Sequence, residues 1–207
     1  ALRWFALGIF GAGAGFYLLW ELDKIPPYMK ERFQVLVDHS LYPLGAGWQQ
    51  TRSLMAIGGG RLTGQGLLHG AQTQSTSSVN LPFRHTDFIF AALCEEMGIL
   101  VGLMVLLVYV LLFLRAGLLA LRSRSALDSL LCVGVLASLS SQTFLIVGGV
   151  VKMIPLTGVT LPFISYGGSS LLSSMLMLGV LQGVSINAGR REESAWLRAH
   201  GREEAET

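Results

Sequence analysis

A short run of charged and hydrogen-bonding residues, Arg84-His85-Thr86-Asp87, ends at the start of a long apolar segment. If that segment enters a bilayer, the Asp87 carboxylate lies at the boundary between lipid and water. There it can contact the polar head group of a lipid-linked molecule while the apolar tail stays in the membrane. The structural alternative is that Asp87 is an N-cap, because an aspartate directly before an apolar helix is favoured in that role.

Two further acids, Glu95 and Glu96, follow Asp87 by eight and nine residues inside the same apolar segment. In a continuous helix they lie about 12 to 13 Å deeper along the axis, and Ala91 and Ala92 leave space beside them. Ionisable residues within a membrane segment are functional-site candidates by default. The alternative is a structural ion pair with Arg or Lys from helices outside this chain.

The glycine-rich stretch 58–66, which contains Arg61, precedes these residues. Glycines allow backbone N–H groups to approach an anion closely. The spacing matches neither a Walker loop nor a dinucleotide-binding fingerprint. A flexible turn is therefore the alternative.

A second constellation, 154–170, is uncharged and contains Pro155, Pro162 and a Gly-Gly pair, so it cannot form one continuous helix. Non-helical backbone near membrane depth is tolerated where it is buried in protein or lines a cavity, which predicts a re-entrant loop. Ser169 or Ser170 is expected to cap the last helix, whose N-terminus attracts anions such as phosphate. A capped turn without a ligand is the alternative, and Lys152 at the same surface could simply snorkel.

The composition indicates that these residues belong to a membrane protein. Hydrophobic residues make up 52% of the 207 and charged residues only 14%, and the mean hydropathy is +0.56. Four stretches have the length and apolar character of a membrane span; they are 2–22, 88–114, 129–151 and 169–187. The fold class is therefore all-α, a polytopic membrane protein. The net charge of +2, without a basic stripe, excludes nucleic acid as a partner.

Basic residues predict the orientation of the spans. Arg115, Arg122 and Arg124 follow the second span, and four arginines follow the last span. Short loops rich in Lys and Arg stay in the cytoplasm, so Asp87 is expected on the external side. Amphipathic patterns at 28–37 and 48–57 predict two short helices that roof the site. The predicted organisation is a transmembrane helix at 1–22, an external loop at 23–87, three transmembrane helices at 88–187 with a re-entrant-like loop at 152–170, and a cytoplasmic tail at 188–207.

Together, the motifs resemble those of the SEDS family, the RodA, FtsW and SpoVE proteins of bacterial elongation, division and sporulation. The matching segments are 85–90, 95–98, 155–158 and 161–170. Family members typically have ten transmembrane helices, and this chain resembles the last four. The segment 142–150 departs from the pattern of many members, so the branch of the family stays open.

The resemblance implies a peptidoglycan glycosyltransferase of the bacterial cytoplasmic membrane. It polymerises lipid II, whose sugars are carried on undecaprenyl pyrophosphate, usually with a class B penicillin-binding protein. Asp87 matches the family's essential loop aspartate and is expected to be the general base and a ligand of any divalent cation, Mg or Mn, that neutralises the pyrophosphate. The expected substrate contacts are Arg61, Arg84, His85, Glu95, Glu96, Lys152, Ser169 and Ser170.

Two other functions remain open at this stage. A lipid II flippase needs a polar route through the full depth of the membrane, whereas the charged groups here gather near one face. A membrane scaffold for a penicillin-binding protein would use close helix packing, for which 11–15 is suited. The six helices that the family places upstream complete the cavity, so we expect these 207 residues alone to be inactive.

Overall fold

Every regular element in the described part of the chain is a helix, as predicted. The computed structural model describes residues 18, 21, 22, 26–37, 45–74, 81–123 and 125–203, without the side chains of 37, 46 and 191–203. The predicted span 2–22 lies almost entirely outside these residues. The chain divides into two compact units, Ala1–Trp48 and Gln49–Thr207, and all candidate site residues belong to the second.

Both short helices expected in the external segment are present. They are α2, Pro27–Val37, and α3, Ala46–Gly59. The Ser53 hydroxyl of α3 is buried and donates to the Val150 carbonyl at 3.0 Å. Because the last carbonyls of a helix have no partner within it, this bond joins α3 to the C-terminal end of α6.

The predicted span 88–114 is wrong, because the chain breaks at Gly98 into α4, Ile89–Met97, and α5, Ile99–Arg122. Gly98 has a φ of 89°, and a Cβ at this position would lie 2.3 Å from the Leu62 carbonyl oxygen. The backbone of the preceding loop therefore passes directly against the break. Glu95 and Glu96 lie in α4, before this break, and are therefore ahead of the membrane-spanning helix α5.

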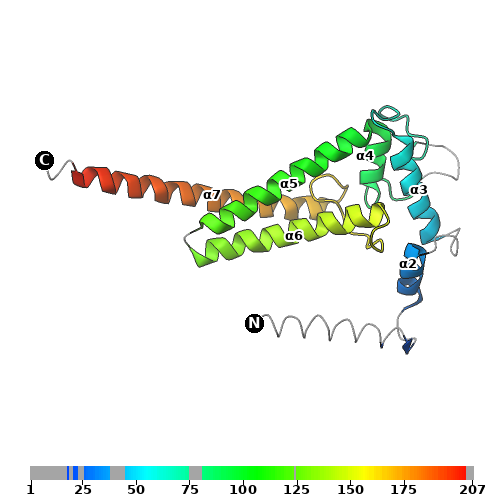
Figure 1. Ribbon diagram of the computed structural model, residues 1–207, viewed down its shortest axis with the longest axis horizontal. Helices are drawn as coiled ribbons and strands as arrows, with labels where there is room; N and C mark the ends of the chain where they lie inside the picture. Colours follow the sequence, from blue (N-terminus) through cyan, green and yellow to red (C-terminus); the bar gives the residue numbers. More distant parts are fainter. Residues whose placement is uncertain are drawn as a thin grey trace. The chain divides into compact units, whose positions relative to one another are not determined.

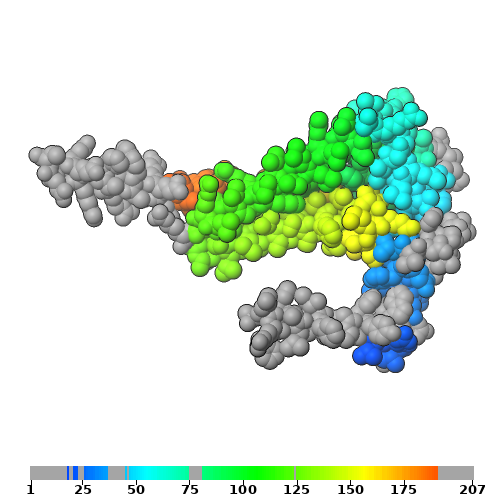
Figure 2. Space-filling view, viewed as in Figure 1, coloured from blue at the N-terminus to red at the C-terminus, as the bar shows by residue number. Residues whose placement is uncertain are grey.

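Three helices are long and apolar enough to cross a membrane: α5, α6, Ala126–Val150, and the first part of α7, Gly168–Arg190. At 1.5 Å per residue, the 24 residues of α5 extend about 36 Å, enough to span the hydrocarbon core. Figures 1 and 2 show α5 and α6 packed along their length. Within the predicted tail at 188–207, α7 continues as a helix to Glu203, beyond the candidate span that ends at Arg190.

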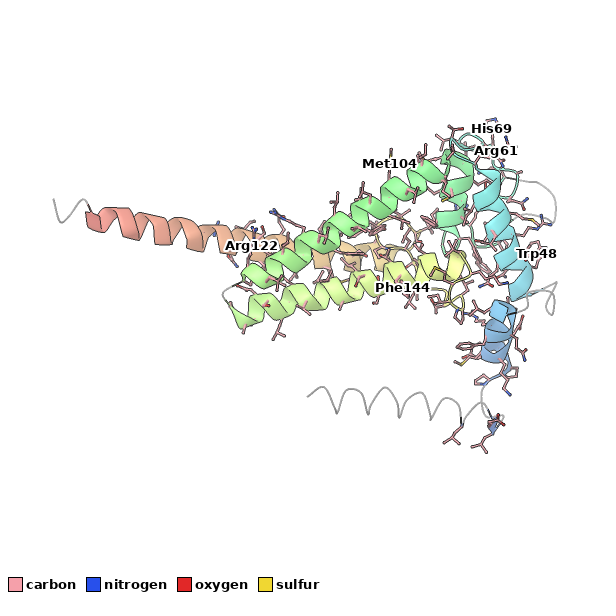
Figure 3. The ribbon with its side chains drawn as sticks, in the orientation of Figure 1. Trp48, Arg61, His69, Met104, Arg122 and Phe144 are labelled. Atoms are coloured by element: carbon pink, nitrogen blue, oxygen red, sulfur yellow. The ribbon has the colours of Figure 1, made fainter. Side chains whose placement is uncertain are left out.

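Two apolar clusters hold the second unit together. The cluster near the start of α5 joins α3, α4, the ends of α5 and α6 and the 151–167 segment; it contains Ala56, Leu81, Phe88, Phe90, Ala91, Cys94, Tyr109, Ile146, Val150, Leu156 and Leu161. The other joins α5, α6 and α7 and contains Ala116, Ala120, Cys132, Val135, Leu139, Leu181 and Val184. Arg61 and Arg122 mark the two ends of this arrangement in Figure 3. The candidate residues therefore gather at the first cluster.

The segment between α6 and α7 is non-helical, as the prolines predict. Its backbone enters the left-handed region at Lys152, φ 63°, and at Phe163, φ 66°. Residues other than glycine rarely adopt this backbone conformation, and it is maintained only where the surrounding contacts enforce it. This segment is therefore held in a specific shape.

Candidate functional site

The two sequence motifs are joined by two hydrogen bonds, from Ser165 and Tyr166, and a third bond within the second motif holds Ser165 in place. The Ser165 hydroxyl donates to the Thr86 carbonyl at 2.8 Å and accepts from the Leu161 N–H at 2.9 Å. The next residue, Tyr166, donates its backbone N–H to the His85 carbonyl at 2.8 Å. Ser165 is buried. Segments 79 residues apart are thereby fixed to each other directly beside Asp87.

Asp87 lies one residue before the N-cap of α4. The N-cap position itself is Phe88, which provides no side-chain cap hydrogen bond. The half-buried Asp87 carboxylate instead faces the Pro-Leu-Thr-Gly turn: its Oδ2 lies 3.6 Å from where a Cβ would stand on Gly158. Gly158 has a φ of 69°, a conformation that glycine adopts without a steric penalty. The structure therefore places the Asp87 carboxylate between the two motifs, with Phe88 at the N-cap position of α4.

A cavity of about 490 Å³ opens beside this junction. The residues that line it are His85, Ile89, Phe163, Ile164, Ser165, Tyr166, Gly167, Gly168 and Leu171. Gly168 begins α7, so the N-terminus of that helix, with its partial positive charge, contributes to the wall. The predicted serine caps are wrong, because Ser169 and Ser170 lie inside the first turn. The Ser170 hydroxyl accepts a hydrogen bond from the Thr160 hydroxyl at 2.7 Å.

Arg84 connects to the cavity through His85. Its Nε donates to His85 Nε2 at 3.1 Å, which assigns the acceptor role to that ring nitrogen. Its Nη1 is buried and has no hydrogen-bond partner among the residues that the structure describes. A buried guanidinium N–H without an acceptor is unfavourable. An anion at this position would satisfy it.

Glu95 and Glu96 contact the chain's own loop. Glu95 is 0% exposed and accepts from the Gln72 N–H at 2.7 Å, so it is not placed as the expected substrate contact. Glu96 accepts from Leu68, Thr73 and Gln74. Burial by itself would raise the pKa of Glu96, but these hydrogen bonds and the positive charge of Arg84 lower it below the ordinary value. Glu96 is thus held as a carboxylate.

The other two expected cationic contacts lie elsewhere. Arg61 is exposed, with its carbonyl accepting from the Ile99 N–H at 2.9 Å. Lys152 is half-buried and directly follows α6. Among the residues described around the cavity wall, neither is present. The structure brings together His85, Ser165 and the start of α7, and it leaves Arg61 and Lys152 outside that group.

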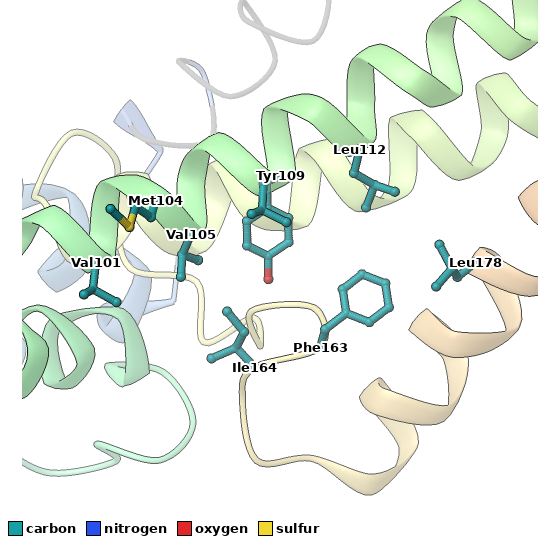
Figure 4. A pocket seen from close by; sticks show the side chains of 9 residues that line it. Val101, Met104, Val105, Tyr109, Leu112, Phe163, Ile164 and Leu178 are labelled. Carbon is teal, nitrogen blue, oxygen red and sulfur yellow. The ribbon is translucent and has the colours of Figure 1, made fainter. Parts of the chain in front are cut away.

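An apolar groove of about 430 Å³ adjoins the cavity and shares Phe163 and Ile164 with it. Figure 4 shows Tyr109 of α5 pointing toward the loop that carries these two residues, with Leu178 of α7 on the far side. The buried Tyr109 hydroxyl donates to the Pro162 carbonyl. Tyr109 was not among the residues that the sequence motifs singled out. It could have been found as the only tyrosine in the apolar stretch 99–122, because a buried tyrosine hydroxyl usually requires a hydrogen-bond partner.

The described residues do not form a metal site by themselves. In the part of the chain that the structure covers, no three His, Cys, Asp or Glu side chains are grouped so that they could hold an ion. Magnesium often uses only one or two carboxylates together with substrate phosphates. In such a site Asp87 would supply one carboxylate ligand, and the remaining ligands would come from outside the described residues.

Comparison with known proteins gives a consistent result. The family model for FtsW, RodA and SpoVE, described as a cell cycle protein, matches residues 2–190. The chain is 41% identical over 158 residues to the peptidoglycan glycosyltransferase MrdB of Escherichia coli K12, an alignment that covers 76% of this chain and 42% of MrdB. It is 36% identical over 188 residues to the peptidoglycan glycosyltransferase RodA of Mycobacterium tuberculosis H37Rv, covering 90% of this chain and 38% of RodA.

The fold also matches a solved structure. A chain from a peptidoglycan synthase complex, described in terms of coordinated polymerization and crosslinking, superposes with a TM-score of 0.67 at 28% identity. The match covers 90% of this chain and 49% of that chain. The 207 residues therefore span less than half the length of the proteins they match.

Proposed function

Because the chain belongs to the FtsW, RodA and SpoVE family of membrane proteins, we propose that the protein is a peptidoglycan glycosyltransferase that polymerises lipid II. In this proposal, polymerisation takes place at the outer face of the bacterial cytoplasmic membrane. The similarity to the peptidoglycan glycosyltransferases MrdB and RodA supports this activity. The observation that carries it in this chain is the Ser165–Thr86 hydrogen bond, which joins both motifs beside one half-buried carboxylate.

Asp87 is the general base of the proposed reaction. Its carboxylate takes the proton of the acceptor sugar's 4-hydroxyl while that oxygen attacks the anomeric carbon of a sugar carried on undecaprenyl pyrophosphate. The bond from that carbon to the pyrophosphate breaks, the carrier leaves with the electron pair, and the proton remains on Asp87. A general base contributes about 10² to 10⁴ in rate. Positioning of the sugars and stabilisation of the leaving group must supply the rest.

Two groups at the cavity suit the leaving pyrophosphate. Arg84 donates to His85 of the wall and has a buried Nη1 without an acceptor among the described residues, and the N-terminus of α7 contributes to the wall at Gly168. Both attract an anion. We propose that the pyrophosphate lies between them, next to His85. Arg61 and Lys152 remain proposed as outer contacts.

The adjoining groove suits the lipid part of the substrate. Its described lining is entirely apolar and meets the cavity at Phe163 and Ile164. Burial of an isoprenoid chain against apolar side chains is favourable at about 25 cal/mol per Å². A head group in the cavity with its chain in the groove would bring the sugars to Asp87 without leaving the membrane surface.

Two proposals concern what this chain does not contain. A class B penicillin-binding protein is the proposed partner, supported by the match to a peptidoglycan synthase complex. A divalent cation, Mg or Mn, is the proposed cofactor, and removal with EDTA should then slow polymerisation. The flippase and scaffold hypotheses are the competing functions.

The test uses the intact protein reconstituted with fluorescent lipid II, with and without its cognate penicillin-binding protein. Polymer formed by the wild type and abolished by Asp87→Asn would support the proposal. Movement of lipid II across the membrane without polymer would support the flippase. Polymer made only by the partner would support the scaffold.

A further inference from the structure

The C-terminal half of α4 and the segment 60–74 pack backbone against backbone. A Cβ on Gly60 would lie 1.9 Å from the Cys94 carbonyl oxygen, and one on Gly64 would lie 2.2 Å from that of Glu96. The Gln65 and Gly66 N–H groups donate to the Glu95 and Glu96 carbonyls at 2.9 and 3.0 Å. Such contact requires glycine and leaves no room for side chains or water.

The carboxylates of Glu95 and Glu96 extend this contact over the rest of the segment. Glu95 Oε1 accepts from the Gln72 N–H at 2.7 Å. Glu96 accepts from the Leu68 N–H at 3.1 Å, the Thr73 hydroxyl at 3.0 Å and the Gln74 side-chain amide at 3.2 Å. Hydrogen bonds to an ionised acceptor are roughly twice as strong as neutral ones. Two adjacent acids therefore organise a loop that is otherwise without regular structure.

A second set of contacts links this loop to the residues beside the cavity. The Leu81 N–H donates to the Gln72 carbonyl at 2.8 Å, so the residue bonded to Glu95 also holds the start of the segment that carries Asp87. Leu81 is buried in the apolar cluster with Phe88, on the other side of Asp87. Arg84 lies close enough for its charge to act on Glu96. The path from the two acids to the Asp87 segment therefore has two branches.

We propose that Glu95 and Glu96 are positioning residues that hold the segment 81–88 in its reactive conformation by ordering the loop 60–74. The inference rests on the proposed glycosyltransferase activity, in which the two acids contact neither the substrate nor the reacting atoms. Their contribution passes through Gln72 to Leu81 and through the charge of Arg84. Glu95 Oε2 is fully buried and has no hydrogen-bond partner among the described residues, an unfavourable feature that tight packing of this loop must outweigh.

The test compares Glu96→Gln and Glu95→Gln in the intact protein with Asp128→Asn as the control. Asp128 lies in the first turn of α6, whereas α3 contacts the other end of that helix through the bond from Ser53 to Val150. Glutamine keeps the shape, but its NH₂ group cannot accept a hydrogen bond. Backbone hydrogen exchange is measured over 65–74, 81–88 and α5, and polymerisation is measured as kcat and KM. Thr73→Val, which removes only the hydroxyl that donates to Glu96, provides a milder second variant if the glutamine variants do not accumulate.

The proposal predicts that exchange over 65–74 and 81–88 rises about tenfold or more, as expected for loss of a hydrogen bond to a charged group. It also predicts that kcat falls while KM and the exchange of α5 stay as in Asp128→Asn. Unchanged exchange over 81–88 would overturn it, and so would an unchanged kcat in a variant whose loop exchange has risen. Full activity of Asp87→Asn would instead overturn the proposed function. The exchange data would still show whether the loop 60–74 orders the segment 81–88.

Discussion

Ser165→Ala should separate the two motifs while leaving the rest of the fold in place. The Ser165 hydroxyl makes the hydrogen bonds to the Thr86 carbonyl and from the Leu161 N–H. Alanine removes it without adding volume. The Thr86 carbonyl directly precedes Asp87 in the chain, so the loss acts on the backbone that carries the carboxylate.

The magnitude follows from the two backbone groups that lose their partner. Ser165 is 7% exposed, so water reaches this position poorly. A buried polar group left without a hydrogen bond costs about 1 to 3 kcal/mol. We expect the free energy of unfolding to fall by about 2 kcal/mol or more. Because a displacement of about 1 Å at a reacting group can cost 10²-fold in rate, we expect kcat for polymerisation to fall at least tenfold.

Ser173→Ala is the matched control. The Ser173 hydroxyl is exposed and donates to the Ser170 carbonyl within the same helix at 2.9 Å. The assay is polymerisation of lipid II by each intact variant, normalised to folded protein, together with thermal unfolding. If Ser165→Ala polymerised as fast as Ser173→Ala, the junction would not position Asp87, and our reasoning from this hydrogen bond would be refuted.

Three further predictions concern the supports of the site. Tyr109→Phe removes the buried donor to the Pro162 carbonyl and should lower the free energy of unfolding by about 1 kcal/mol; an unchanged melting temperature would contradict this. Gly158→Ala forces a left-handed φ on alanine beside Asp87 and should lower the free energy of unfolding by about 1 to 2 kcal/mol. Gly179→Ala, where a Cβ would meet nothing within 4 Å, should leave the melting temperature unchanged or raise it. Equal changes in melting temperature for the two variants would count against the account. Because the folded state lowers the pKa of Glu96, the contribution of Glu96 to stability is present above the ordinary pKa of 4.5 and is lost as the pH falls below that value, through the folded pKa. Glu96→Gln should therefore reduce the loss of stability with falling pH in this range. If the free energy of unfolding fell equally with pH in both proteins, Glu96 would not be the cause.

Much of the fold could be predicted from the sequence because membrane spans depend on composition over about 20 residues. The third and fourth spans and the two short helices predicted at 28–37 and 48–57 are where the sequence patterns placed them. The break at Gly98 could not be predicted in the same way. The segment 88–114 is apolar throughout apart from its acids, and the break depends on the Leu62 backbone, which is distant in sequence.

The candidate site was predictable in part for a related reason. Asp87, His85 and the second motif were singled out by residue type and by family resemblance, and the structure places them together. A sequence does not show whether a carboxylate faces a cavity or accepts hydrogen bonds from its own loop, as Glu95 does. Arg61 and Lys152 share the positive charge of Arg84, but charge alone does not predict that Arg84 hydrogen-bonds His85 of the cavity wall.

The most direct measurement of the central claim is the rate of lipid II polymerisation by intact Asp87→Asn protein, which keeps the shape of the side chain and removes the base. We predict loss of about 10² to 10⁴ in kcat, the usual contribution of a general base, with the melting temperature and lipid II binding of the wild type. A folded Asp87→Asn protein that polymerises lipid II at the wild-type rate would contradict the account.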